Sequence, residues 1–295
     1  MSEVSAVPQV TWRDFITLTK PGILRSNLVA TFGGFWLASR WNIDWFLMIW
    51  VLIGTTLVMA SSCVFNNLLD REYDMKMNRT KNRALPAGRI HPKIVFWYGA
   101  ALGILGLAVF IIFTNLTTVM LALVGMFVYV IVYTLWLKRT STWSTSVGAI
   151  SGAMPPVIGY CSIEGVIDMG AILLFVILFL WQPPHFWALG IRRKDEYRAA
   201  GFPLLPVVKG VRRTQWQMIP YVALLIPSGI LLFYYGYVGY IFLIVSTILG
   251  LMWLVLCIRG VRGQDETKWA KQAFLFSIQY LPIVMLVMII DTVKG

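Results

Sequence analysis

The chain has 295 residues, of which 58% are apolar and only 13% are charged, and its mean hydropathy is +0.74. Soluble domains are about half apolar and about one quarter charged, so this composition excludes an ordinary water-soluble protein and requires a lipid solvent. The formal net charge of +12 does not indicate nucleic acid as a partner, because basic loops of membrane proteins ordinarily determine their topology.

The sequence predicts an all-α integral membrane protein, a bundle of nine transmembrane helices forming a single domain over residues 1–295. Segment 1–13 is polar and lacks the apolar core of a secretory signal, so the first span is expected to act as the insertion signal. Apolar runs near the roughly 20 residues that cross a bilayer then recur along the chain. They cover about 22–39, 44–68, 94–113, 117–137, 143–161, 169–190, 217–236, 238–258 and 273–291.

Lysine and arginine fall almost entirely on one side of this expected bundle. Of the 25 basic residues, only Arg40 and Lys294 lie in segments assigned to the other side. Because positively charged loops stay in the cytoplasm, we expect a cytoplasmic N-terminus and an external C-terminus. Two cytoplasmic connections are long, at about 70–93 and 191–216. Long loops of this kind are expected to cap that face and to carry function.

Polar side chains end the second expected span in a regular register. Asn66, Asp70 and Asp74 are spaced by four residues, so on a helix they share one face. Oxygen ligands grouped in this way suit Mg²⁺, which binds through one or two carboxylates and substrate phosphates. A metal ion would also relieve the repulsion between a diphosphate and the negative end of the helix dipole. The alternative is a solvated collar of acids and bases that pair with one another.

Basic side chains follow the acidic motif and supply donors for phosphate oxygens. The expected diphosphate ligands are Arg71, Lys76, Arg79, Arg83, Lys138 and Arg139. Lys138 and Arg139 end the fourth expected span, where they can equally act as simple topology charges.

The acidic segment 66–74 resembles the first Asn-x-x-x-Asp-x-x-x-Asp signature of the UbiA-type intramembrane prenyltransferases. Segment 78–88 is similar to their Arg-Thr-x-x-Arg-Pro-Leu-Pro-x-Gly element, with Ala84 where proline is common. Lys20-Pro21 resembles the entry to their first span. The resemblance implies a membrane enzyme that transfers a prenyl group from its diphosphate, with Mg²⁺ as cofactor and the active site on the cytoplasmic side.

The sixth expected span ends in Trp181-Gln182-Pro183-Pro184-His185, where many members of that superfamily carry a second carboxylate motif. Together with segments 133–139, 152–159 and 205–210, this stretch resembles the protohaem farnesyltransferase (haem O synthase) family over nearly the whole chain. The resemblance implies that farnesyl diphosphate and haem b are substrates. The farnesyl group would join a haem vinyl group, water would add, and haem O and diphosphate would form. It further implies a bacterial cytoplasmic (inner) membrane, with haem A synthase or a terminal oxidase as candidate partners.

His185, Trp181 and Tyr133 are the expected haem contacts, and imidazole is a suitable ligand for haem iron. A structural histidine and an interfacial aromatic belt are the alternatives. After the sixth span, Asp195-Glu196-Tyr197 places glutamate where the family usually has aspartate, so either acid is open as a further metal ligand. The expected metal ligands are Asn66, Asp70, Asp74, Asp195 and Glu196. The expected catalytic residues are Asn66, Asp70, Asp74, Lys138 and His185.

Two other functions remain open from the sequence. A related membrane enzyme would prenylate a quinone precursor, and haem-dependent spectra would distinguish it from an enzyme that acts on haem. A non-enzymatic haem or lipid carrier would carry the acidic register by chance, and turnover with release of diphosphate would exclude it.

Overall fold

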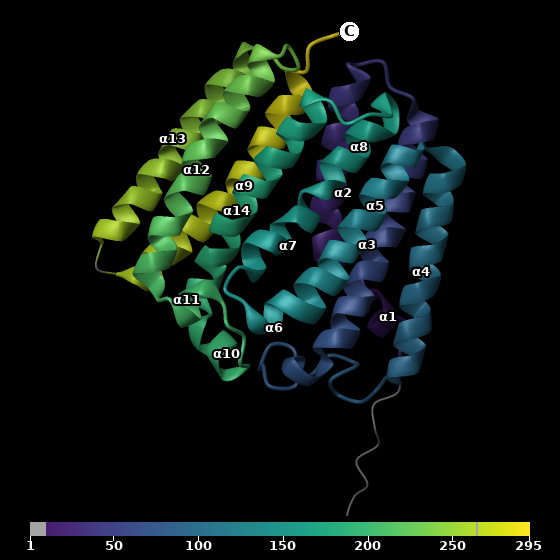
Figure 1. Ribbon diagram of the computed structural model, residues 1–295, viewed down its shortest axis with the longest axis vertical. Helices are drawn as coiled ribbons and strands as arrows, with labels where there is room; N and C mark the ends of the chain where they lie inside the picture. Colours follow the sequence, from purple (N-terminus) through teal and green to yellow (C-terminus); the bar gives the residue numbers. More distant parts are fainter. Residues whose placement is uncertain (1–9, 264) are drawn as a thin grey trace, which may run out of the picture.

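The computed structural model describes residues 10–263 and 265–295, in which long helices run side by side along one axis (Figure 1). The prediction about the N-terminal segment therefore falls mostly on residues outside the described part. The single-helix spans are α2 (Pro21–Ser39), α3 (Trp45–Asp74), α4 (Pro92–Phe113), α9 (Met169–Arg192), α12 (Val211–Tyr234), α13 (Tyr240–Arg262) and α14 (Glu266–Ile290).

Two further spans are composed of several consecutive helical segments. The fourth consists of α5 (Leu116–Phe127), the π-helix η1 (Val128–Leu137) and α6 (Lys138–Thr140), and the fifth of α7 (Ser144–Gly152) and α8 (Met154–Glu164). Within the described residues, eight spans are long and apolar enough to cross a membrane. The remaining one, α2, is less apolar because Arg25, Ser26 and Asn27 occupy its first turns. The predicted all-α membrane bundle is confirmed, and its helical segments agree with the predicted spans.

Most of the long connections gather at one end of the bundle, which we call the loop end (Figure 1). The short helices α1 (Trp12–Leu18), α10 (Lys194–Ala199) and α11 (Leu205–Val208) lie there with the connection from α3 to α4. The C-terminus lies at the opposite end, where the Gly295 N–H donates to the Arg40 carbonyl at 3.3 Å. Arg40 and Lys294, the two basic residues that the charge pattern sets apart, are thus together at the end away from the loops.

The N-terminal helix α1 is tied to the connection between α3 and α4. Asp14 accepts from the Thr11 backbone N–H at 3.0 Å and pairs with Arg89 at 3.0 Å. These two donors hold the pKa of the Asp14 carboxyl below its usual range. The carboxylate therefore stays charged at neutral pH and fastens α1 to the loop end.

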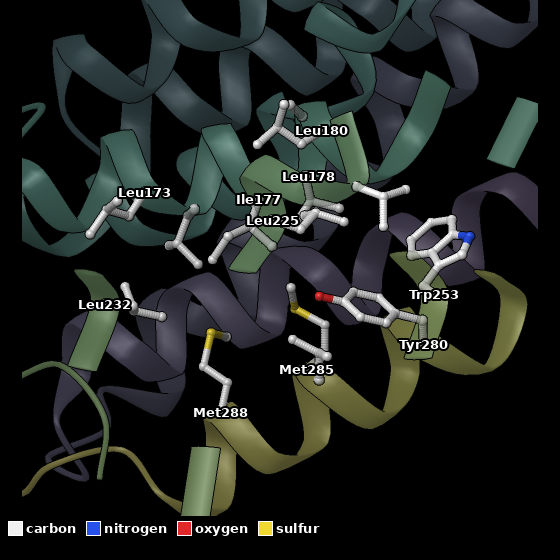
Figure 2. Packing of buried hydrophobic residues seen from close by; sticks show 14 of the residues in the cluster. Leu173, Ile177, Leu178, Leu180, Leu225, Leu232, Trp253, Tyr280, Met285 and Met288 are labelled. Atoms are coloured by element: carbon white, nitrogen blue, oxygen red, sulfur yellow. The ribbon is translucent and has the colours of Figure 1, made fainter. Parts of the chain in front are cut away.

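Apolar packing joins α9, α12, α13 and α14 into one half of the bundle. Figure 2 shows Leu178, Leu225, Trp253, Tyr280 and Met285, which lie on these four helices and are all buried. Since lipid is as apolar as such a core, close packing rather than water exclusion holds helices together within a membrane.

Glycines allow α2 and α8 to cross with their backbones in contact. A Cβ atom built on Gly34 would lie 2.7 Å from the Pro156 carbonyl carbon, and one on Gly159 would lie 2.9 Å from the Phe35 nitrogen. Real Cβ atoms do not approach backbone so closely, so only glycine fits at these two positions. The crossing fixes α2, whose first residue follows Lys20 at the loop end.

Gly34→Ala is therefore expected to destabilise the protein by about 2 kcal/mol, because the added methyl group forces the two backbones apart. Thermal unfolding of the purified protein in detergent measures the change. Gly22→Ala is the matched control in the same helix, since a Cβ atom at Gly22 would meet nothing within 4 Å. Equal unfolding temperatures for the two variants would contradict the close crossing.

Candidate active site

The acidic motif occupies the final turns of α3 at the loop end. α3 is one continuous helix of 30 residues through Asp74, so Asn66, Asp70 and Asp74 do share a face. Their relative exposures are only 3%, 3% and 7%. This burial contradicts the solvation that the collar alternative expects, because a solvated collar would leave the carboxylates in water. The pairing of acids with bases that it also expects is present at Asp70 and Asp74.

Asp70 is the centre of the buried charges. Its Oδ2 forms an ion pair with the Lys138 ammonium, and its Oδ1 lies 3.9 Å from Arg139 Nη2. Oδ1 is buried and has no hydrogen-bond partner among the described residues. A buried, unpartnered carboxylate oxygen is costly and calls for a further ligand. The donor set of Asn66, Asp70 and Asp74 therefore fits a hard divalent cation.

Asp74 is held by the connection that follows it. Arg83 pairs with Asp74 Oδ2 at 3.1 Å and also donates to Asn67 Oδ1 at 3.2 Å. Thr80 donates to the Asp74 carbonyl at 2.9 Å. The chain after α3 thus folds back over the motif and brings the Arg83 guanidinium to it.

Asn66 is held from two sides by residues outside the expected site. Lys20 donates to its Oδ1, and its Nδ2 donates to Thr134 Oγ1 at 2.9 Å. The Thr134 hydroxyl donates in turn to the Tyr129 carbonyl at 2.8 Å, five residues earlier along η1. Widened π-helical turns of this kind occur frequently at functional sites.

Lys20 has two features that each cost folding free energy, a left-handed backbone and a buried ammonium group. Its backbone is left-handed, with φ of 54°, which is uncommon for a residue other than glycine. Burial lowers the pKa of its ammonium to about 8. The sequence signal for Lys20 was the Lys20-Pro21 resemblance alone, whereas Thr134 lies four residues before Lys138 and so on the same side of its helix.

The expected diphosphate ligands divide into two groups. Arg83, Lys138 and Arg139 contact the acids or lie within 3.9 Å of them. The other three are exposed: Arg71, Lys76 and Arg79. The structure thus brings Arg83 of the α3–α4 connection and Lys138 and Arg139 of α6 to the motif. The other three bases remain at the surface.

Aromatic rings and the second long connection close the site. Tyr129 and Tyr133 stack with their centroids 5.7 Å apart, and Lys138 Nζ lies 5.9 Å from the Tyr133 ring. On its other side Lys138 Nζ lies 4.9 Å from the Phe202 ring. Phe202 also stacks on Tyr73, with centroids 5.0 Å apart. The two long connections therefore pack together over the loop end, as the sequence predicts.

Asp195 and Glu196 do not join the first motif. Asp195 pairs with Arg198 at 2.9 Å and its side chain is 92% exposed, while Glu196 lies 3.9 Å from Arg193. In the part of the chain that the structure describes, no group of three or more His, Cys, Asp or Glu residues is placed to hold a metal. The motif of Asn66, Asp70 and Asp74 has two carboxylates, so it offers three metal ligands only if the Asn66 amide oxygen is counted.

His185 belongs to a separate cluster between α9 and α14. Its Nδ1 lies 2.7 Å from Ser277 Oγ, and its ring lies between Trp181 and Phe274, with centroids 4.7 and 4.9 Å away. Trp181 Nε1 donates to the Ser277 carbonyl at 2.9 Å. Of the three expected haem contacts, His185 and Trp181 are thus in contact, whereas Tyr133 lies beside Lys138.

A profile of the UbiA prenyltransferase family matches residues 27–278. The chain belongs to the UbiA prenyltransferase family. It is 44% identical to protoheme IX farnesyltransferase 1 of Bacillus subtilis (strain 168), with 98% of this chain and 93% of that protein aligned. It is 41% identical to protoheme IX farnesyltransferase of Yersinia pseudotuberculosis serotype O:1b (strain IP 31758), with 95% of each chain aligned.

Solved structures share the UbiA fold. A digeranylgeranylglyceryl phosphate synthase superposes with a TM-score of 0.81 at 18% identity, covering 96% of this chain and 99% of that one. A UbiA homolog from Archaeoglobus fulgidus, bound to DMAPP and Mg²⁺, has a TM-score of 0.68 at 18% identity, covering 93% and 99%. The family and the fold predicted from the sequence are therefore confirmed, and this membrane protein is a prenyltransferase.

Thr134→Val is expected to lower kcat/KM for prenyl transfer about ten-fold, because a buried amide that loses its partner costs about 1–3 kcal/mol. Valine keeps the shape of threonine but cannot accept from Asn66. Thr134→Ser keeps the hydroxyl and should restore most of the activity and the wild-type unfolding temperature, whereas the valine variant should unfold at a lower temperature because its Asn66 amide is left without a partner. Equal activity of the valine and serine variants would show that Asn66 does not need this anchor.

Proposed function

We propose that this UbiA-family enzyme is a haem O synthase. It transfers the farnesyl group of farnesyl diphosphate to a vinyl group of haem b, with addition of water, and releases haem O and diphosphate. The observation that carries the transfer is the buried row of Asn66, Asp70 and Asp74 with its unpartnered Asp70 oxygen. The acceptor is supported by the full-length similarity to protoheme IX farnesyltransferases at 41–46% identity.

In this proposal, Asn66, Asp70 and Asp74 hold Mg²⁺, whose charge would offset the negative charge that develops on the leaving diphosphate. Lys138, Arg139 and Arg83 donate to the phosphate oxygens. Lys138 and Arg83 pair with these carboxylates, and Arg139 lies 3.9 Å from Asp70. Small side-chain movements would therefore bring the three bases to the phosphate oxygens. Arg71, Lys76 and Arg79 are exposed and would attract the diphosphate from solution. A role for Asp195 or Glu196 as a metal ligand remains a prediction.

The reaction breaks the bond between the farnesyl carbon and the diphosphate oxygen, and the electron pair leaves with the diphosphate. The stacked rings of Tyr129 and Tyr133 lie beside Lys138 and would stabilise the allylic cation through their π electrons. The surrounding apolar bundle keeps water from this cation until it has reacted. The vinyl π electrons of haem then form the new carbon–carbon bond, and water adds to the resulting cation and loses a proton to leave the hydroxyl group.

The cluster around His185 is the proposed haem contact. Ser277 engages Nδ1, so Nε2 is the nitrogen that would meet haem iron. Trp181 and Phe274 stack on opposite sides of the imidazole and fix its orientation. Loss of activity in His185→Ala with unchanged haem spectra would argue against iron ligation.

Under the same proposal the loop end faces the cytoplasm, which the positive charge of its loops supports, and the bacterial relatives favour the inner membrane. Farnesyl diphosphate, haem b and membrane lipid are then its molecular partners. A haem A synthase or a terminal-oxidase assembly would be the protein partner that receives the product.

The test of the proposed function is turnover by the purified protein in lipid with haem b, farnesyl diphosphate and Mg²⁺, followed by mass spectrometry. We expect a haem product heavier by one farnesyl group and one hydroxyl group, and we expect a chelator to abolish it. No such product from folded protein, together with prenylation of an aromatic quinone precursor, would replace haem as the acceptor. Binding of haem without release of diphosphate would favour a carrier.

Asp70→Asn is expected to lower turnover by at least about 100-fold, because the amide keeps the shape of the carboxylate but loses the charge that would hold the metal. The unfolding temperature should fall, because Lys138 loses its buried partner, so size-exclusion chromatography is needed to show that the variant is still folded. Glu72→Gln is the matched control, since Glu72 lies on the same helix with its side chain 69% exposed and only 3.6 Å from Arg71. Normal turnover by a folded Asp70→Asn protein would refute the metal assignment.

A further inference from the structure

A second polar pocket lies at the loop end, on the outside of the bundle. It has a volume of about 360 Å³ and lies between α3, the start of α4 and α6. Its lining consists of Leu68, Leu69, Arg71, Glu72, Pro92, Lys93, Phe96 and Arg139. Leu68 and Glu72 are each two residues from Asp70, which turns them about 200° around the helix from the acidic face. The pocket therefore opens on the side of α3 opposite the acidic face, and it shares only Arg139 with the diphosphate clamp of the proposed active site.

The charge of this pocket is complementary to an anion. Three basic residues line it, Arg71, Lys93 and Arg139, against one acid, Glu72. The Arg71–Glu72 pair is exposed and 3.6 Å long, so it neutralises the charge of Arg71 only weakly. Arg139 Nη2 is already engaged, because it donates to the Leu69 carbonyl at 2.7 Å. The cations left for an anion in the pocket are Lys93 and Arg71.

Exposed aromatic side chains place the pocket at the level of the lipid headgroups. Phe96 and Trp97, in the first turns of α4, are 46% and 69% exposed, and Trp136 and Trp143 beside α6 are each 61% exposed. Aromatic rings gather where lipid meets water. Beyond Phe96 the surface of α4 is apolar, and only 28% of its apolar stretch is buried in the protein. An occupant with a charged head and acyl chains matches both parts.

We propose that this pocket binds the phosphate headgroup of an anionic phospholipid, with its chains along Phe96 and the outer face of α4. Lys93 and Arg71 hold the phosphate, as basic pockets between membrane helices do on the cytoplasmic side. The pocket has one carboxylate, Glu72, and so lacks the set of acidic ligands that a metal-bound prenyl diphosphate requires. The proposal does not depend on the identity of the prenyl acceptor.

The test is native mass spectrometry of the full-length purified protein, titrated with phosphatidylglycerol or with phosphatidylcholine of the same acyl chains. We expect one phosphatidylglycerol to bind in preference to phosphatidylcholine. Lys93→Gln should weaken phosphatidylglycerol binding about five-fold and leave phosphatidylcholine unchanged, because it removes one cation from the pocket. Phe96→Ala should weaken both lipids, because it removes the apolar wall that the chains share.

Lys81→Gln is the matched control for this experiment. Lys81 is exposed in the connection between α3 and α4, donates to Asn78 Oδ1 at 3.0 Å, and does not line the pocket. It should leave both affinities at wild-type values. Equal affinity of the wild-type protein for the two lipids, or equal losses in Lys93→Gln and Lys81→Gln, would overturn the proposal. Displacement of phosphatidylglycerol by metal-free farnesyl diphosphate would show that the pocket belongs to the substrate instead.

Discussion

The structure depends on one electrostatic constraint, which is the burial of two carboxylates and an amide in the last turns of α3, at the loop end. A charged group cannot be taken out of water without a partner, so each of these side chains requires a group from elsewhere in the chain. Lys20 comes from the residue before α2, Lys138 from the start of α6, and Arg83 from the connection that follows α3. The arrangement of the loop end follows from the need to deliver these three groups to one place.

The packing of the bundle makes this delivery reliable. The glycine crossing holds α2 against α8 and so fixes the position from which Lys20 reaches Asn66. The π-helical turn in η1 directs the Thr134 hydroxyl to the Asn66 amide and leaves Lys138 beside Asp70. Phe202, from the second long connection, covers Lys138 and joins the two loops. Rigid helices thus carry the motif, and the loops supply charge and cover.

Features with a strong periodic signal could be predicted from the sequence. Apolar runs gave the spans, and the four-residue register gave the shared face of Asn66, Asp70 and Asp74, since both follow from helix geometry. Hydrogen bonds across the bundle could not be found in this way, because Lys20 and Asn66 are separated by 46 residues and Asn66 and Thr134 by 68. The π-helical turn was read as ordinary helix, since its residues are equally apolar in either form. Charge alone also could not separate Arg83 from Arg79, because only the path of the connection decides which one turns inward.

The pairing of acids with bases also makes the centre favour a cation and an anion that bind together over either ion alone. A free divalent cation must compete with Lys138 and Arg83 for Asp70 and Asp74, and a free anion must compete with the carboxylates for the same bases. When both enter together, each set of side chains exchanges one opposite charge for another, and neither is left buried alone. Cation and anion then favour each other's binding, which is a positive thermodynamic coupling within one site. Under the proposed function, such a centre would bind phosphate or a metal ion alone weakly and the two together tightly.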